Sequence, residues 1–210
     1  MPLSRRDPVA TREKLVTAAV RLIVKNGYHG SGVDAICEEA GVTKGSFFHH
    51  FANKDQLGLA VIAWWSAMGT REFSKAWENE SMDPLDQLET MLDIMEGFAR
   101  RPSEPCVCAI GMMAQELAET HPEIRKHCAA ELAVWTAHVA ALLERAATLH
   151  QPTDGFNAER VAWFLNSVWQ GSMLLAKTRD DKQLIIQNLQ QARAYIRTLF
   201  PHRTSTRKTS

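Results

Sequence analysis

Apolar residues recur along this chain with the spacing of one face of an α-helix. Leu15, Ala18, Ala19, Leu22 and Ile23 fall at i, i+3, i+4, i+7 and i+8, the pattern of a helix that is buried along one stripe. Alternating runs of Val, Ile and Thr, which are typical of strands, are absent from the sequence. The pattern therefore predicts an all-α fold.

Capping residues and helix breakers set the bounds of the predicted helices. Asn26-Gly27 ends the first helix, because both residues tolerate the left-handed conformation. Thr43, Asn53 and Asn157 each offer a side-chain oxygen to the free N–H groups of a following helix. Two prolines in residues 101–105 break the body of the chain. The predicted helices span about 8–25, 33–40, 43–51, 54–78, 83–100, 107–119, 122–150, 157–178 and 180–200.

Charge is distributed unevenly although the 24 basic and 24 acidic residues cancel. Residues 1–54 carry 8 Lys and Arg against 5 Asp and Glu, whereas residues 80–150 carry 5 against 12. A basic first quarter joined to an acidic middle is typical of a DNA-binding head on a body that stays away from phosphates. Chance variation among solvated faces is the alternative interpretation.

Composition narrows the class of protein further. No apolar run approaches the roughly 18 residues of a membrane span, and no apolar stretch follows the basic N-terminus as in a signal peptide, so we expect a cytoplasmic protein. An enzyme would need a nucleophile with a base, paired carboxylates or a metal cluster, and the sequence offers no such set. We therefore expect no enzyme and no cofactor. The cysteines are expected to be free thiols in a reducing compartment; they are Cys37, Cys106, Cys108 and Cys128.

Residues 33–51 predict a helix-turn-helix. The small Ala40 lets two short helices approach, Gly41 takes the tight turn, and Val42 fills the space between them. The second of these helices would lie in the major groove of DNA with its N-terminal residues facing base edges.

The same segment resembles the TetR family of bacterial regulators. The resemblance rests on Asn26-Gly27-Tyr28, on Val33-Asp34-Ala35-Ile36, on the unbroken string from Ala40 to Phe51, and on Asn53-Lys54-Asp55-Gln56-Leu57, in the family's order and spacing. It implies a helix-turn-helix domain in residues 1–54 and an effector-binding and dimerisation domain in residues 55–200. Composition predicts a disordered tail in residues 201–210.

The resemblance also implies a function. We expect a repressor that binds a palindromic double-stranded operator as a homodimer and releases it when a small molecule or electrophile acts on it. A transcriptional activator, or an architectural DNA-binding protein without an effector, is the alternative. Two recognition helices in a two-fold dimer would lie about 34 Å apart, one turn of B-DNA.

By position in the family motif, the second short helix supplies side chains to bases and phosphates, and the start of the first supplies backbone N–H groups to a phosphate. Position 48 is usually Tyr in the family, so the phosphate bond of its hydroxyl is lost at Phe48 or replaced by a neighbouring histidine. Phe47 and Phe51 are expected in the core. The predicted DNA-binding residues are Ser31, Gly32, Thr43, Lys44, Gly45, Ser46, Phe48, His49, His50 and Lys54.

The body is rich in Met and Trp, which suit a pocket for an apolar or aromatic effector because thioethers repack and indoles stack. Ordinary core packing is the alternative for each residue taken alone. The predicted pocket residues are Trp64, Met68, Met91, Met95, Phe98, Met112, Met113, Trp135 and Met173.

The segment from Pro105 to Leu117 resembles the signature that opens the sixth helix in one branch of the family, with Cys108 at the family's Cys position. The resemblance implies redox or electrophile sensing by Cys108 with Lys177, and Cys106 as a second thiol. A nearby ammonium or helix N-terminus would increase the reactive thiolate fraction. A small buried hydrophobe is the alternative for Cys108, and a solvated cation for Lys177. A metal on the two cysteines would need His121, His127 or His138, and no tight ligand spacing supports it, so we expect no metal.

Two apolar helices near the C-terminus predict the dimer surface. Each is too apolar to be covered from one side only, so four helices, two from each subunit, would form an isologous contact. The predicted interface residues are Phe164, Val168, Trp169, Ser172, Leu175, Leu189, Ala192 and Ile196.

Overall fold

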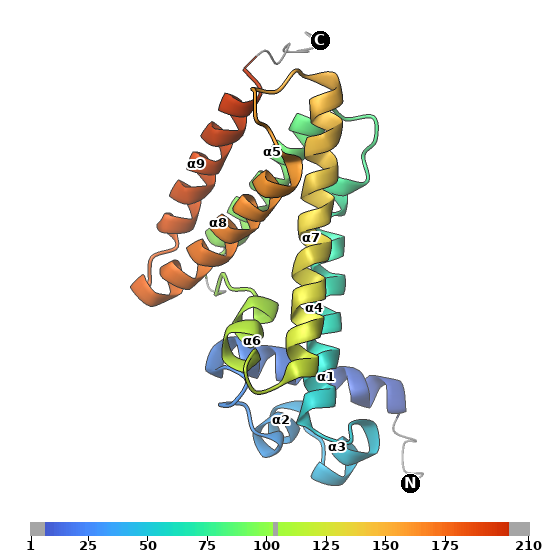
Figure 1. The fold of residues 1–210 in the computed structure, drawn as a ribbon. Helices are drawn as coiled ribbons and strands as arrows, with labels where there is room; N and C mark the ends of the chain where they lie inside the picture. The colour runs from blue at the N-terminus through green and yellow to red at the C-terminus, as the bar shows by residue number, and fades with distance from the viewer. Residues whose placement is uncertain (1–6, 103–104, 202–210) are drawn as a thin grey trace. The chain divides into compact units, whose positions relative to one another are not determined.

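The computed structural model describes residues 7–102 and 105–201. The described ranges contain helices and turns but no strand, which confirms the all-α prediction (Figure 1). They group into two compact units. The first unit holds the described residues up to Gly69 together with Cys108–Glu131, and the second holds Thr70–Val107 and the described residues from Leu132 onward. This division cuts two long helices and does not fall between residues 54 and 55.

The first unit contains α1 (Pro8–Asn26), α2 (Val33–Ala40), α3 (Lys44–His50), α6 (Ala109–Leu117) and the first parts of α4 (Lys54–Trp77) and α7 (Pro122–Leu149). The second unit contains the remainder of α4 and α7 with α5 (Pro84–Arg100), α8 (Ala158–Arg179) and α9 (Gln183–Leu199). Within the predicted tail, Pro201 is exposed, and residues 202–210 lie outside the described residues.

Helix starts follow the capping residues that the sequence predicts. The Thr43 hydroxyl accepts from the Ser46 N–H at 3.2 Å at the start of α3. Asn53 Oδ1 accepts from the backbone N–H three residues on at 2.9 Å, and Asn157 Oδ1 does the same at 2.8 Å. Each bond satisfies one of the N–H groups that a helix leaves unpaired in its first turn, which explains why local sequence predicted these boundaries.

Helix α6 is shorter than the predicted 107–119. It begins after Cys108, whose sulfur accepts from the Gly111 N–H at 3.4 Å in the capping position. It ends at Leu117, whose carbonyl accepts from the N–H groups of Thr120 and His121 at 3.1 and 2.9 Å. This turn precedes Pro122, the residue that opens α7.

The core of the first unit lies under the two short helices. Leu15 and Ala19 of α1, Ile36 of α2 and Phe47 of α3 are each 0 % exposed. Phe51 is also buried, so the prediction that both phenylalanines are core residues is confirmed.

In the second unit, α9 packs against both α5 and α8 (Figure 1). Leu189, Ala192 and Ile196 of α9 are buried, and so are Trp169 and Ser172 of α8. The side chains of these five residues, which the sequence predicts at the dimer interface, are covered by helices of their own subunit. Of the remaining predicted residues, Phe164 and Leu175 are exposed and Val168 is half-buried.

Arg193 of α9 gathers three carboxylates of α5. Its guanidinium pairs with Asp93 at 2.6 Å and Glu96 at 3.3 Å, and it also bonds Glu89. The Arg193 side chain is 14 % exposed, so the ion pairs lie partly out of solvent. Burial alone would lower the pKa of this guanidinium, but the bonds and charges of Asp93 and Glu89 outweigh burial and raise it. Arg193 therefore neutralises part of the acidic middle of the chain.

We predict that Arg193→Ala lowers the free energy of unfolding by about 2 kcal/mol. Removing it leaves partly buried carboxylates without their cation, and the loss stays below the roughly 3–5 kcal/mol of a fully buried pair because water reaches Asp93. Chemical denaturation measures the change. Arg197→Ala is the matched control, since Arg197 is 71 % exposed and bonds only Glu89 among the described residues. Equal losses in the two variants would contradict the prediction.

Candidate nucleic-acid interface

The turn between α2 and α3 has the geometry of a helix-turn-helix. Gly41 ends α2 at φ +64°, in the left-handed region that favours glycine. The N–H groups of Gly41 and Val42 donate to Glu38 O and Cys37 O, each at 3.0 Å. These bonds close the end of α2 and direct the chain into α3.

Helix α3 is only seven residues long and is held by its surroundings. Its anchor is Phe47, which is fully buried, with its ring 5.1 Å from that of Phe48 and 5.8 Å from that of Phe51. Arg12 of α1 lies over the Phe51 ring at 5.1 Å. The opposite face of α3 is left to solvent.

That outer face holds most of the predicted DNA-binding residues. Ser46 and His50 are half-buried, and the histidine rings at 49 and 50 lie 5.1 Å apart. Phe48 is 52 % exposed, an unusual setting for a phenylalanine. The exposed residues in this part of the set are Thr43, Lys44, Gly45, Phe48 and His49.

Lys44 already has an anionic partner. Its ammonium lies 2.8 Å from the carboxylate of Asp34 on α2, with side chains 57 % and 80 % exposed. The hydrogen bond to Asp34 raises the pKa of Lys44. An ion pair this exposed contributes little to stability, so an approaching phosphate can replace Asp34 at small cost.

Ser31, a predicted phosphate contact, is buried in the turn between α1 and α2. The Ser31 side chain is fully buried and donates to Gly27 O at 2.7 Å, while the Ser31 N–H donates to Tyr28 O at 3.1 Å. Both donors of Ser31 therefore bond within the turn, and contact of its N–H with a phosphate would require that N–H to leave Tyr28 O. Gly32, at the start of α2, is exposed.

Lys54 also points into the protein. Its ammonium donates to Tyr28 O at 2.6 Å and lies over the Tyr28 ring, 4.1 Å from the centroid. Burial lowers the pKa of this half-buried lysine, although nearby Glu116 and Asp55 act in the opposite direction. Lys54 thus joins the start of α4 to the turn after α1, and contact with a phosphate would require it to leave this position.

A polar cluster that the sequence did not predict surrounds Lys54, and we call it the Glu116 cluster. The Glu116 carboxylate of α6 accepts from the N–H groups of Tyr28 and His29, each at 2.7 Å, and bonds His29 Nδ1 at 2.7 Å. The Tyr28 hydroxyl donates to Asp55 at 2.5 Å, and His121 lies 3.7 Å from the same carboxylate. The cluster comprises Tyr28, His29, Lys54, Asp55, Glu116 and His121.

The candidate thiols differ in their surroundings. Cys106 and Cys108 are half-buried, and Cys108 caps α6. Cys128 is buried, and burial together with the nearby Cys108 raises the pKa of its thiol to about 11. Lys177, on α8 in the second unit, is exposed. The described residues contain no group of three or more His, Cys, Asp or Glu side chains suited to a metal ion.

The predicted effector residues divide between the units. Trp64, Met68, Met112 and Met113 belong to the first unit, and Met91, Met95, Phe98, Trp135 and Met173 to the second. Of the six methionines in this set, Met91, Met95, Met113 and Met173 are buried.

Within the second unit, Trp135 belongs to an aromatic cluster. Its ring lies 6.4 Å from those of Phe73 and Trp77, and Phe73 lies 6.0 Å from Phe98. The Trp135 indole Nε1 is buried and has no hydrogen-bond partner within the described residues. A buried indole donor normally finds an acceptor, so this atom is a candidate contact for a bound molecule.

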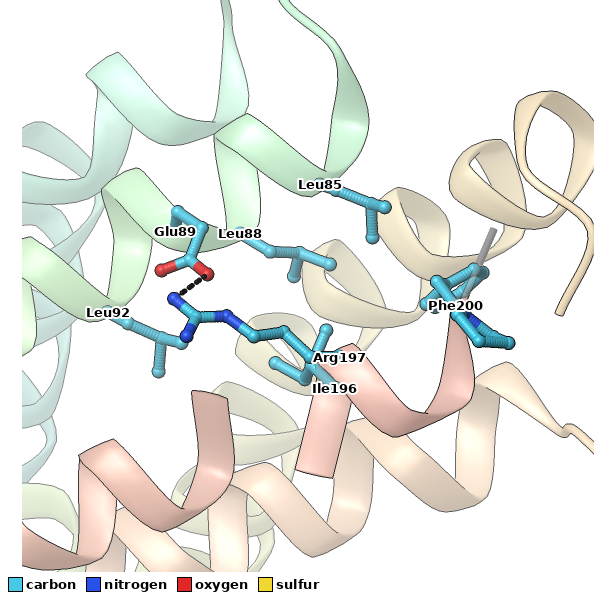
Figure 2. A pocket seen from close by; sticks show the side chains of 8 residues that line it. Leu85, Leu88, Glu89, Leu92, Ile196, Arg197 and Phe200 are labelled. Carbon is cyan, nitrogen blue, oxygen red and sulfur yellow. Dashed lines mark hydrogen bonds and ion pairs between the residues drawn. The ribbon is translucent and has the colours of Figure 1, made fainter. Parts of the chain in front are cut away.

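A cavity of about 270 Å³ lies elsewhere, between α5 and α9, and Figure 2 shows its lining. Leu85, Leu88 and Leu92 form one wall, and Arg197 reaches across to Glu89 at 3.4 Å. These leucines are at most 3 % exposed, so this wall of the cavity belongs to the packed core of the second unit. None of the predicted effector residues lines it.

No helix within the described ranges is both long enough and apolar enough to cross a membrane. A helix-turn-helix with an exposed recognition face, followed by a helical body, defines the class of DNA-binding transcriptional regulators.

Comparison with known proteins identifies the family. Residues 15–61 match the model of the bacterial regulatory proteins of the tetR family, and residues 84–192 match a tetracyclin repressor-like C-terminal domain. The chain belongs to the TetR family of transcriptional regulators, which are not enzymes.

Individual relatives are distant but extend over most of the chain. The transcriptional regulator AcuR of Cereibacter sphaeroides is 27 % identical over 84 % of this chain and 80 % of its own length. The transcriptional repressor DhaR of Mycobacterium sp. strain GP1 is 25 % identical over 88 % and 90 %. A TetR regulator from Chloroflexus aurantiacus shares the fold with a TM-score of 0.82, at 24 % identity over 92 % and 98 %.

Proposed function

We propose that this protein is a cytoplasmic repressor that binds a palindromic operator as a homodimer and releases it when an effector or a thiol-modifying electrophile acts on its body. The observation that carries the proposal is the outer face of α3, where Thr43, Lys44, Phe48 and His49 are exposed on a helix fixed by buried Phe47. The similarity to a regulator named as a repressor, DhaR, favours repression over activation.

The exposed side chains of α3 suit both forms of DNA contact. Lys44 can exchange Asp34 for a phosphate, and His49 can hydrogen-bond a base or a phosphate. The Phe48 ring has no hydroxyl for a phosphate, but it is suited to apolar contact with a thymine methyl group. The operator is found by selecting duplexes from a random library with the purified chain. Failure to enrich any sequence would contradict the proposal.

We predict that Lys44→Ala weakens binding to the selected duplex severalfold and lowers the slope of log affinity against log salt by about 1, since one phosphate contact is lost. Fluorescence anisotropy at several salt concentrations measures both quantities. Lys126→Ala removes the same charge from an exposed position of α7 and should leave the slope unchanged. A Lys44 variant with the wild-type slope would show that this ammonium contacts no phosphate.

The dimer is proposed to form through an exposed apolar patch on α8 and α9. Phe164 and Leu175 of α8 are 45 % and 51 % exposed, and half-buried Val168 lies between them at helical spacing. Tyr195 of α9 continues the patch, with its ring 5.1 Å from that of Phe164. Trp163 and Leu174 extend it at 44 % and 48 % exposure. Large apolar side chains gathered on one surface favour a protein partner, and a second copy suits a two-fold operator.

We predict that Leu175→Glu converts the dimer to a folded monomer and lowers operator affinity at least about tenfold, because a buried unpaired charge is costly and a single head loses half of the site. Sedimentation equilibrium measures the mass. Leu149→Glu is the matched control, since Leu149 is 66 % exposed on α7, away from the patch in sequence. A Leu175 variant that remains a dimer would place the interface elsewhere.

The effector is proposed to be an aromatic molecule that carries a hydrogen-bond acceptor. The unpaired indole N–H of Trp135 offers the donor, and the rings of Phe73, Trp77 and Phe98 offer stacking surfaces. The other predicted residues of this unit, Met91, Met95 and Met173, supply flexible apolar walls. Trp64, Met68, Met112 and Met113 are the candidates in the first unit.

Electrophile sensing is proposed to act through Cys108. The Gly111 N–H contacts its sulfur at 3.4 Å, and a helix N-terminus stabilises negative charge on a thiol. Cys128 is the poorer nucleophile, because its thiol is buried and its raised pKa leaves little thiolate near neutral pH. Cys106, two residues before Cys108 in the sequence, is the proposed second thiol of the sensor.

We predict that N-ethylmaleimide lowers operator affinity of the wild type and has no effect on Cys108→Ser, which binds the operator normally. The maleimide adduct adds bulk at the half-buried sulfur that caps α6, and we expect this bulk to displace the start of the helix. Gel-shift titration with and without the reagent measures the response, and Cys106→Ser is the matched control that should still respond. Release of the Cys108 variant by the reagent would assign the sensor to another residue.

A further inference from the structure

The first turn after α1 leaves two backbone donors that only a distant residue satisfies. The N–H groups of Tyr28 and His29 are consecutive, and both donate to the carboxylate of Glu116, which lies 88 and 87 residues further along the chain. Two converging N–H groups form a site for a negatively charged group. His29 adds its ring nitrogen, so Glu116 receives three bonds of 2.7 Å from one turn.

Gly27 makes this contact possible. It has φ +79°, and a Cβ at this position would lie 3.0 Å from Glu116 Oε2. The carboxylate is therefore packed against the bare backbone of the turn. Burial acts to raise the pKa of Glu116, but the hydrogen bonds from His29 and Tyr28 outweigh it, and the pKa of this carboxyl lies below its ordinary value. The anionic form is the one that the turn holds.

The turn between α1 and α2 also positions the helix-turn-helix. Ser31, two residues after His29, returns its hydroxyl to Gly27 O at 2.7 Å and its N–H to Tyr28 O, and α2 begins at Val33. On the other side, Tyr28 O accepts from Lys54 at the start of α4. The segment that Glu116 holds thus joins the three helices α1, α2 and α4 around the recognition helix α3.

We propose that Glu116 is a positioning residue for operator binding: from α6 it holds the turn between α1 and α2, and so keeps the helix-turn-helix in the arrangement that reads DNA. This inference rests on the proposed function, since it assigns a role in binding an operator. Glu116 itself makes no contact with DNA. Its effect passes through Tyr28 and His29.

Loss of the contact has a defined chemical consequence. Glu116→Gln keeps the side-chain volume but replaces one acceptor oxygen by an NH₂ group, which cannot accept from a backbone N–H. Charge-assisted hydrogen bonds correspond to a factor of roughly 10 to 100 in an equilibrium constant. A turn that is released in part of the population lowers the apparent affinity by the fraction that remains competent.

The experiment compares Glu116→Gln with Glu119→Gln in the full chain. Glu119 is exposed and loses the same charge, but the structure gives it no bond to the turn. Hydrogen exchange at the Tyr28 and His29 amides, without DNA, reports the contact directly. Fluorescence anisotropy with the selected duplex reports operator affinity. We expect the Glu116 variant to exchange faster at both amides and to bind on the order of tenfold more weakly, and the Glu119 variant to match the wild type.

Reciprocity supplies a readout that a purely structural role would not change. If the contact strengthens operator binding, then the operator must strengthen the contact by the same factor, so DNA should slow exchange at Tyr28 and His29 in the wild type.

Should Glu116→Gln fail to fold, His29→Ala removes one of the three bonds at a side chain that is 62 % exposed, and a smaller loss of affinity in the same direction is expected.

Three outcomes would overturn the proposal. Faster exchange with unchanged operator affinity would mean that Glu116 stabilises the turn without affecting DNA binding. Equal losses in the Glu116 and Glu119 variants would indicate a general effect of charge. A wild-type chain that enriches no duplex would remove the proposed function itself, and the exchange comparison would then still report whether Glu116 holds the turn.

Discussion

A helix of seven residues cannot sustain itself in water, because too few hydrogen bonds repay the cost of nucleation. Helix α3 exists because Phe47 is fully buried beneath it, the Thr43 hydroxyl caps its first turn, and Gly41 directs the chain into it. Burial of this one ring therefore holds the helix while its opposite face stays exposed to solvent. Every exposed side chain on that face, Phe48 included, is available for contact with a partner, and the helix is held by the core of the unit and not by its own length.

Local chemistry explains why so much of the head could be predicted from sequence. Caps such as Thr43 and Asn53, and the turn at Gly41, act over three or four residues, so their identities specify the helix bounds directly. The Glu116 cluster is different. Its key bonds join residues 88 and 87 apart, and nothing in the spacing of an acid on α6 indicates which backbone it meets. The sequence predicts Lys54 as a phosphate contact for a related reason. Its position at a helix start does not indicate that the Tyr28 carbonyl lies 2.6 Å from its ammonium.

The burial of residues that the sequence predicts at the dimer surface has a similar origin. An apolar stripe on α9 must be buried, but its sequence does not indicate whether it packs against another chain or against another part of the same chain. Here α5 and α8 provide it, so Leu189 and Ile196 are core residues, while Phe164 and Leu175, on another face of α8, remain exposed. A charge count likewise shows that this region is acidic but does not show which acids share a cationic partner. Asp93 and Glu96 meet Arg193 of α9, so the acidic middle of the chain is partly compensated within the subunit.

The close packing of Gly27 against Glu116 limits how this protein can be recombined. Sequence boundaries suggest that residues 1–54 are a self-contained reading head that could be joined to the body of a different regulator. The turn after α1, however, is completed by a carboxylate from α6, and a side chain at position 27 would be strained at φ +79° and would press on that carboxylate. A chimera would need to bring both partners from the same parent, or to supply an equivalent acid at the same place. The portable module is thus discontinuous: the first helices travel together with α6.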